Sequence, residues 1–240
     1  MSWVISREEW IRIYNYITTH LPELNFARDQ LATDILSAII SKHRSVLPLE
    51  EFLEDLRGFD LAVVVGCSES LYKDLATLGK LTARNDGVLL VAADGAVSAL
   101  LEHGFVPHLV VSDLDGDFNS IKKASSMGSI VVTHAHGDNI SKLRRVLELE
   151  GPVIGSTQVE PRPHVHNFGG FTDGDRALYI LYHAGYRRII LAGFNFDEPH
   201  VCPGKVVVDY AVKKKKLDVA KWLISLLEDK GLQVVNTREL

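Results

Sequence analysis

Seven short, mostly apolar runs, rich in valine and isoleucine, recur from residue 61 onward, and helix-length segments separate them. The runs cover residues 61–65, 88–92, 109–111, 130–133, 153–154, 189–192 and 232–235. Strands that are buried on both faces of a parallel sheet have this composition. Glycines that can end helices, Gly79, Gly104 and Gly185, close three of the intervening segments. The repeated order of strand, helix and strand predicts a doubly wound α/β fold, in which helices cover both faces of a mostly parallel sheet.

The N-terminal part of the chain has a different pattern. Ser6 and Glu9 match a capping box that opens an amphipathic helix. Two more helices are expected over residues 27–40 and 48–58, with Pro48 at the first helical position, and no strand signal precedes residue 61. The predicted organisation is a helical N-terminal region, residues 1–58, followed by an α/β domain, residues 59–240.

Charge and composition exclude several classes of protein. The 240 residues carry 26 Lys and Arg against 31 Asp and Glu, which gives a formal net charge of −5. Without a general basic field, neither nucleic acid nor an anionic membrane is an expected partner, and phosphate groups must be held by local contacts. The apolar runs are far shorter than the roughly 20 residues that span a bilayer, and no signal peptide is recognisable. Two cysteines, Cys67 and Cys202, provide neither a disulfide framework nor a zinc motif. These features favour a soluble, cytoplasmic protein.

Polar residues follow four of the apolar runs directly. Ligands of an open parallel sheet bind beyond the carboxyl ends of its strands, so these segments are the candidates for a site. They are Asp94-Gly95, residues 112–117, residues 133–139 and residues 193–197. The predicted topology gathers them at one acidic edge that also carries histidines.

Three carboxylates, Asp113, Asp115 and Asp117, lie within five residues of one another in sequence. Closely packed like charges repel unless a cation compensates them. A hard cation with oxygen ligands meets this need, and Mg²⁺ that also holds substrate phosphates is the commonest form. The alternative is a solvated loop whose aspartates cap helices, and for Asp138 or Asn139 alone a cap is an equally good interpretation.

Three further segments are candidates for the site. His134 and His136 share one face of an extended segment, where contact with phosphate or a carboxylate is favoured over zinc. The turn at residues 66–71 opens a helix and can present backbone N–H groups to phosphate, although it matches neither the Walker motif nor GxGxxG. Thr172 and Asp173 begin another helix, either as its cap and first turn or as groups that face the same crevice.

Four segments together resemble the archaeal type of 6-hydroxymethyl-7,8-dihydropterin pyrophosphokinase. They are Ala93-Asp94-Gly95-Ala96, residues 111–116 (Val-Ser-Asp-Leu-Asp-Gly), residues 133–139 (Thr-His-Ala-His-Gly-Asp-Asn) and residues 170–177 (Gly-Phe-Thr-Asp-Gly-Asp-Arg-Ala). The resemblance spans about residues 61–191, and its most specific part is the His-Ala-His-Gly-Asp-Asn segment. More distantly, residues 107–116 and 172–178 look like the Asp-x-Asp and Thr-Asp segments of thiamin pyrophosphokinase.

The sequence departs from these families in two places. The family turn Gly-x-Gly-Pro-Ser-Leu is replaced at residues 66–71 by Gly-Cys-Ser-Glu-Ser-Leu, so that Ser68 stands in place of a glycine. The β-sandwich that follows the catalytic domain of thiamin pyrophosphokinases has no counterpart, which disfavours thiamin as the substrate.

The resemblance implies that residues 59–240 form the catalytic domain of an ATP-dependent diphosphotransferase. It implies Mg²⁺-dependent transfer of diphosphate from ATP to the hydroxyl of 6-hydroxymethyl-7,8-dihydropterin, with release of AMP, in the biosynthesis of a pterin cofactor of the tetrahydromethanopterin or folate type. Asp113 and Asp115 are the expected principal Mg²⁺ ligands, and Asp173 is a further ligand or orients the hydroxyl. Either Asp173 or Asp138 is the expected catalytic proton acceptor. The expected ATP or substrate contacts are Gly66, Ser68, Ser70, Asp94, Gly95, His134, His136, Asp138, Asn139 and Thr172.

Other functions stay open at the level of sequence. They are a thiamin pyrophosphokinase-like activity, a nucleotide-sugar glycosyltransferase that uses its Asp-x-Asp motif to hold a metal, and a non-catalytic nucleotide-binding module on the same fold. A homodimer is also compatible with the sequence, and the N-terminal helices either form a dimer contact or cover the site.

Overall fold

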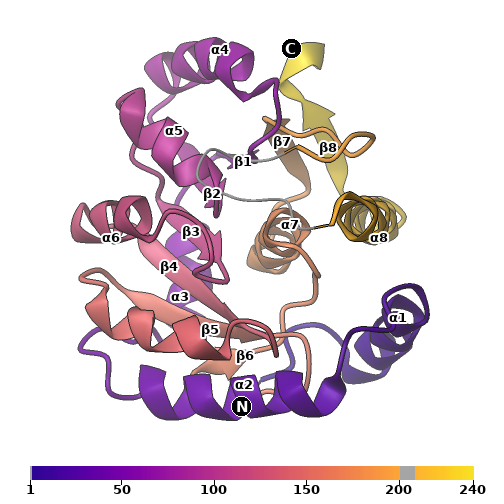
Figure 1. Ribbon diagram of the computed structural model, residues 1–240. Coiled ribbons are helices and arrows are strands. Elements are labelled where there is room, and N and C mark those ends of the chain that lie inside the picture. Colours follow the sequence, from indigo (N-terminus) through magenta and orange to yellow (C-terminus); the bar gives the residue numbers. More distant parts are fainter. Residues whose placement is uncertain (1, 201–208) are drawn as a thin grey trace.

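In the computed structural model, which describes residues 2–200 and 209–240, the apolar runs form one eight-stranded sheet (Figure 1). The strand order is β6-β5-β4-β3-β2-β1-β7-β8, and every neighbouring pair is parallel. The strands are β1 (Leu61–Val65), β2 (Val88–Ala93), β3 (Leu109–Ser112), β4 (Ile130–Ala135), β5 (Val153–Thr157), β6 (Val165–His166), β7 (Arg188–Ala192) and β8 (Gln233–Asn236). The chain builds outward from β1 to β6 and then returns to place β7 against the other side of β1. The topological switch point, where ligands of such sheets bind, therefore lies between β1 and β7.

Alternation along the central strands divides the core into two layers. In β1, Ala62 and Val64 belong to one buried cluster, whereas Val63 and Val65 belong to the other. The first cluster is covered by α1 (Arg7–His20), α3 (Leu49–Leu56), α7 (Asp173–Ala184) and α8 (Tyr210–Glu228). The second is covered by α2 (Phe26–Ile40), α4 (Leu71–Arg84), α5 (Ala96–Glu102), α6 (Phe118–Ser126) and the 3-10 helix η1 (Ile140–Glu148). This arrangement confirms the predicted α/β fold with helices on both faces and a helical N-terminal region (Figure 1).

The predicted elements differ from the observed ones mainly at their ends. Each of the seven predicted runs becomes a strand, while β6 falls in a stretch without a strand signal. Pro48 is the N-cap of α3 and not its first helical residue. Ahead of β1, the described residues contribute only isolated bridges to the sheet region, from Trp3 to Asn167 and from Val46 to Val153.

The N-terminal helices pack directly on the rest of the chain. Helix α2 contacts β4, β5, β6 and η1, and Figure 1 shows it crossing the β5–β6 end of the molecule. On the opposite layer, the indole of Trp10 in α1 donates to the Gln158 carbonyl at 2.8 Å. The division at residue 58 remains a prediction.

The remaining predictions from the sequence concern membrane-spanning helices and the two cysteines. Within residues 2–200 and 209–240, no helix combines the length and the apolar character that a membrane crossing needs. Cys202 lies outside the described residues.

Candidate active site

Two adjoining hollows open at the carboxyl ends of the strands. The first, here named the switch-point hollow, lies between β1 and β7 and is lined by Gly66, Ser68, Asp94, Gly95 and Gly193, among others. The second, named the acidic hollow, is lined by a set that includes Asp113, Asp115, His134, His136, Asp138, Gln158 and Phe171. Both hollows share Thr172, Asp173, Lys213 and Leu217. The start of α7 therefore stands between two concave sites, and most of the predicted site residues line one or both of them.

A carboxylate cluster lies where β2 and β3 end. Asp94, Asp113 and Asp115 each offer an oxygen atom, and these oxygens all lie within 4.8 Å of one another. Asp94 follows β2, and the other two follow β3, its parallel neighbour. A donor set made only of carboxylate oxygens fits a hard divalent cation such as Mg²⁺. Asp173 lines both hollows but is not a member of this cluster.

The position of Asp94 depends on its neighbours in β3 and in the following turn. Asp94 is only 4% exposed, and its backbone N–H donates to the Val111 carbonyl at 2.9 Å. The Ser112 hydroxyl donates to Asp94 Oδ1. A Cβ atom on Gly116 would overlap the Asp94 carboxylate. Gly116 therefore allows the chain after Asp115 to pass close to Asp94.

Leu114, between the two other aspartates of the cluster, has a left-handed backbone with φ of +62°. Its side chain is fully buried, and its N–H donates to the Ser112 hydroxyl oxygen at 2.8 Å. Arg145 Nη1 donates to the Leu114 carbonyl at 2.8 Å. A non-glycine residue in this conformation costs on the order of 1–3 kcal/mol and is found preferentially at functional sites. The buried side chain of Leu114 thus fixes the turn in the core, while Asp113 and Asp115 line the acidic hollow.

His134 is a buried, neutral member of the site. Burial lowers its pKa well below the ordinary value, and the charge of Arg176 lowers the pKa further. Arg176 Nη2 donates to His134 Nε2 at 3.0 Å, and Nδ1 lies 3.2 Å from the Ser156 hydroxyl oxygen. Because Nε2 accepts, the imidazole proton belongs on Nδ1. His134 can therefore shape the wall of the hollow without adding a positive charge to it.

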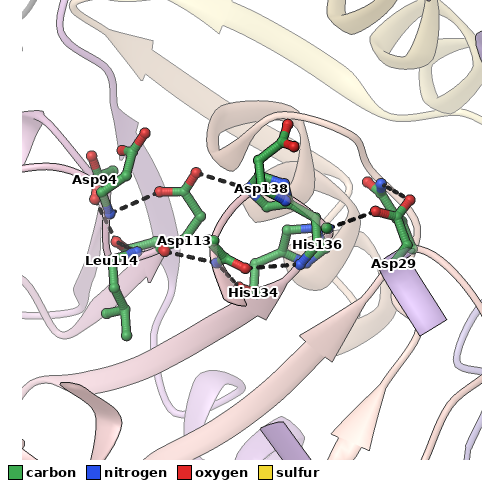
Figure 2. A network of polar contacts seen from close by, with 12 residues as sticks. Asp29, Asp94, Asp113, Leu114, His134, His136 and Asp138 are labelled. Atoms are coloured by element: carbon green, nitrogen blue, oxygen red, sulfur yellow. Dashed lines mark hydrogen bonds and ion pairs between the residues drawn. The ribbon is translucent and has the colours of Figure 1, made fainter. Parts of the chain in front are cut away.

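His136 connects this wall to the carboxylate cluster (Figure 2). Its Nε2 lies 3.2 Å from Asp113 Oδ2, while Nδ1 accepts the Asp138 backbone N–H at 3.3 Å. The rings of His134 and His136 are stacked, with centroids 5.7 Å apart. The imidazole of His136 thus orients one oxygen of Asp113, in the manner expected for a histidine that contacts a carboxylate.

Asn139 and Asp138 have different surroundings although they are adjacent. Asn139 is 1% exposed; its Nδ2 donates to the carbonyls of Asp113 and His134 at 2.8 and 2.7 Å, and its Oδ1 accepts the His136 N–H at 3.0 Å. Asn139 therefore ties the two strand ends together and is not among the residues that line either hollow. Asp138 is exposed and lines the acidic hollow.

The start of α7 is held by Asp175. This carboxylate accepts the N–H groups of Phe171 and Thr172 at 2.5 and 2.8 Å, together with the Thr172 hydroxyl. Asp175 is fully buried, and burial raises the pKa of its carboxyl. The capping interpretation of Thr172 is thus realised by its reciprocal partner at the third helical position, and Thr172 and Asp173 line both hollows as well.

The turn after β1 uses several of its donors within the protein. The N–H groups of Gly66 and Ser68 donate to the carbonyls of Ala192 and Gly193, both at 2.8 Å. The Ser70 hydroxyl donates to Asp74 Oδ2 at 2.8 Å. Gly66 and Ser68 line the switch-point hollow, whereas Ser70 is not among the residues that line either hollow. These bonds fix the turn against β7, and they use the N–H groups of Gly66 and Ser68 within the protein.

Sequence reasoning assigned no role to Arg176, which the structure places behind the site. Arg176 is fully buried, and it donates to the carbonyls of Phe171 and Gly169 at 3.1 and 3.3 Å in addition to His134. Burial lowers its pKa to about 10, so the guanidinium stays charged at neutral pH. The sequence pattern of residues 170–177 points to the site, but it gives no signal that the Arg176 side chain turns inward.

Comparisons with known proteins show the family of this chain. The family model described as "6-hydroxymethylpterin diphosphokinase MptE-like" matches residues 37–200. Three archaeal proteins named "6-hydroxymethyl-7,8-dihydropterin pyrophosphokinase" are similar over nearly their whole length. The protein of Methanothermobacter thermautotrophicus is 37% identical over 237 residues, covering 92% of this chain and 95% of its own. That of Pyrococcus furiosus is 35% identical over 238 residues, covering 96% of each chain.

The protein of Methanocaldococcus jannaschii is 33% identical over 239 residues, covering 93% of this chain and 96% of its own. The family match extends over the carboxylate cluster, the histidine loop and the start of α7, which are the three parts of the site. This chain therefore belongs to the MptE-like 6-hydroxymethylpterin diphosphokinase family of diphosphotransferases.

Proposed function

We propose that the protein transfers diphosphate from ATP to the hydroxymethyl group of 6-hydroxymethyl-7,8-dihydropterin, in a Mg²⁺-dependent reaction that releases AMP. The observation that carries the proposal is the carboxylate cluster of Asp94, Asp113 and Asp115 beside two adjoining hollows. Two concave sites that meet at one helix start suit a reaction between two substrates. The names of the archaeal relatives support the choice of pterin.

Asp113 and Asp115, with Asp94 or Asp173, would hold the magnesium ion. Bound there, the ion would neutralise phosphate charge and hold the triphosphate in position for displacement. His136 keeps one oxygen of Asp113 oriented, and Leu114 and Gly116 keep the turn in the shape that brings the carboxylates together. Lys213 and Lys216 also line the acidic hollow and bring positive charge to it.

The pterin hydroxyl oxygen attacks the β-phosphorus of ATP, and the bond from that phosphorus to the α–β bridging oxygen breaks as AMP leaves. The hydroxyl proton goes to a carboxylate. Asp173 is the best placed of the candidates, because it lies in the first turn of α7 and lines both hollows, whereas Asp138 lines only the acidic one. The protein supplies positioning and charge, and no nucleophile of its own is needed.

This activity belongs to the biosynthesis of a pterin cofactor of the tetrahydromethanopterin or folate type. The protein is cytoplasmic in this proposal, because the cytoplasm contains the ATP that the reaction consumes. The archaeal origin of the three relatives and the absence of a membrane-crossing helix among the described residues are compatible with this assignment.

The test is incubation of the protein with ATP, Mg²⁺ and either 6-hydroxymethyl-7,8-dihydropterin or thiamin, followed by detection of AMP. We expect AMP and the pterin diphosphate with the pterin only. AMP formation with thiamin alone would overturn the choice of substrate. Protection by ATP against thermal unfolding without AMP formation would identify a non-catalytic module, and protection only by a UDP-sugar would favour a glycosyltransferase.

Asp115→Ala should abolish AMP release without unfolding the protein, because it removes one of three charges that face the proposed cation. Asp117→Asn is the matched control: Asp117 caps α6 through the Asn119 N–H at 3.2 Å and is not a member of the cluster. Unchanged turnover in Asp115→Ala would remove the metal assignment. Circular dichroism of both variants checks the fold.

A further inference from the structure

The first turn of α2 reaches into the histidine loop of the active site. Asp29, in this turn, is 3% exposed, and its Oδ1 accepts the Gly137 N–H at 2.7 Å. Gly137 lies between His136, which contacts Asp113, and Asp138, which lines the acidic hollow. Figure 2 shows Asp29 at one end of the polar network that runs through the histidines to Asp113 and Asp94.

The second oxygen of Asp29 is held by two other parts of the chain. Asp29 Oδ2 accepts the Tyr14 hydroxyl at 2.8 Å and Gln158 Nε2 at 2.7 Å. Burial and the charge of Asp29 raise the pKa of the Tyr14 hydroxyl, which therefore stays protonated and continues to donate. Tyr14 belongs to α1, whereas Gln158 lines the acidic hollow. The carboxylate is consequently fixed in one orientation before it meets Gly137.

The neighbouring residue holds the other side of Gly137. Arg28 Nη2 donates to the Gly137 carbonyl at 3.0 Å. A Cβ atom on Gly137 would lie 2.8 Å from Arg28 Cβ, so the loop passes too close to α2 for a larger residue. Arg28 itself is fixed at the helix start, where its N–H donates to the Asn25 side chain at 3.0 Å. Two consecutive residues of α2 thus bind the N–H and the carbonyl of a single residue in the active-site loop.

We propose that Arg28 and Asp29 form a clamp on Gly137 and that Asp29 is a positioning residue for the reaction. The clamp sets the loop on which His136 orients Asp113 and Asp138 faces the substrate. The N-terminal helical region, which carries none of the proposed catalytic groups, then completes the active site. This inference rests on the proposed function for its kinetic consequence, but the clamp itself is testable without catalysis.

Asp29→Ala is the primary variant. We expect kcat to fall about 100-fold, the loss typical of a misplaced catalytic group. We also expect the dissociation constant for Mn²⁺, measured by electron paramagnetic resonance without substrate, to rise about 10-fold, because His136 loses its fixed position against Asp113. The apparent dissociation constant also rises when the folded fraction falls, so both proteins are titrated under conditions in which circular dichroism shows them fully folded. Asp29→Asn keeps an oxygen for Gly137 and should recover part of both losses.

Asp34→Ala is the matched control on the same helix, because Asp34 is exposed and forms a surface ion pair with Arg162 at 2.7 Å. It should leave kcat and Mn²⁺ affinity unchanged. In a nuclear magnetic resonance spectrum, the Gly137 amide proton should move upfield in Asp29→Ala and stay in place in Asp34→Ala. Should Asp29→Ala fail to fold, Arg28→Ala removes the exposed half of the clamp, and a shift of the Gly137 and His136 signals is then expected.

Unchanged Gly137 and His136 signals in Asp29→Ala, or in Arg28→Ala if that variant replaces it, would overturn the clamp. Unchanged Mn²⁺ affinity together with unchanged kcat would overturn the positioning role. Failure of the wild-type protein to form AMP with any pterin, while the Gly137 signal still depends on Asp29, would contradict the proposed function and leave the clamp standing.

Discussion

Leu114 and Gly116 determine the geometry of the carboxylate cluster, although neither carries a ligand atom in its side chain. The left-handed backbone of Leu114 is unfavourable for a γ-branched residue, and burial of its whole side chain between β3 and the helices offsets the cost. Gly116 is needed for a different reason, because any side chain there would meet the Asp94 carboxylate. The turn between β3 and α6 therefore depends on a buried apolar side chain at Leu114 and on the lack of a side chain at Gly116.

Gly116→Ala should weaken divalent cation binding about 10- to 100-fold, because the added methyl group displaces Asp94 from the cluster. Mn²⁺ titration followed by electron paramagnetic resonance measures the effect. Gly58→Ala is the control, since its Cβ would make an ordinary contact of 3.5 Å with the Asp55 carbonyl. Equal Mn²⁺ affinity in wild type and Gly116→Ala would show that Asp94 is not part of the cation site.

The predictable part of the site is the part that strand ends provide. Asp94, Asp113 and His136 follow apolar runs directly, and the carboxyl ends of parallel strands share one edge, so the sequence predicts that they meet. Asp29 gave no such signal, because it lies in the first turn of a helix, where an acidic residue is ordinary, and only the packing of α2 brings it to Gly137. The role of Asn139 was equally hidden, since the direction in which an amide donates depends on the folded loop.

Helix α7 contributes to the site through three residues of its first turn, which have separate tasks. Asp173 lines both hollows, Arg176 turns inward to hold His134, and Asp175 closes the helix start by accepting three hydrogen bonds. The last of these determines where the other two lie, because the cap fixes the rotation of the first turn. Loss of the cap should therefore lower the free energy of unfolding and also displace the site residues of α7.

Asp175→Ala should lower the free energy of unfolding by about 2–3 kcal/mol, because three donors at a buried helix start lose their acceptor. Urea denaturation measures the change. Asp218→Ala on α8 is the control, since it removes only an exposed ion pair with Lys214 at 2.9 Å, and such a pair contributes between about 0 and 1 kcal/mol. A loss in Asp175→Ala no larger than that of the control would contradict the capping role.

Strand β6 shows where prediction from sequence fails at the level of elements. It has two residues, Val165 and His166, in a stretch that also contains Pro161 and Pro163. Two residues display no alternation, and the prolines indicate a loop. The strand forms because β5 offers an open edge, to which Gly155 and Ser156 pair. The longer runs are predictable as strands without such a partner, since their apolar composition alone places them in the interior.

The whole molecule places the N-terminal helices on both layers of the sheet, with α1 and α3 on one side and α2 on the other. The helices themselves were predictable from capping and periodicity. Which face of the sheet each helix covers was not predictable, because the amphipathic pattern of a helix does not indicate the surface on which it packs. The site depends on that assignment, since α1 supplies Tyr14 and α2 supplies Asp29 to one hydrogen-bonded group.

Buried and half-buried histidines in separate elements should make the whole fold sensitive to acid. Burial lowers the pKa of His166 in β6 and of His183 in α7 from 6.5 to about 4, and it lowers the pKa of His134 well below 6.5. Between pH 6.5 and 4 the unfolded chain therefore binds more protons than the folded protein. The stabilising contribution of each neutral histidine is complete above pH 6.5 and is lost as the pH falls toward 4. For each of His166 and His183 the loss is on the order of 2 kcal/mol.

His183→Asn should reduce this pH dependence, because asparagine cannot take up the proton. Urea denaturation at several values between pH 6.5 and 4 gives the slope of the unfolding free energy, and the variant should lose close to one proton of uptake on unfolding. The exposed His20, replaced in the same way, tests whether the substitution itself changes the slope. A His183→Asn slope equal to that of the wild type would show that burial of this imidazole does not keep it neutral. The acid sensitivity would then rest on His134 in β4, His166 in β6 and His108, whose pKa burial also lowers.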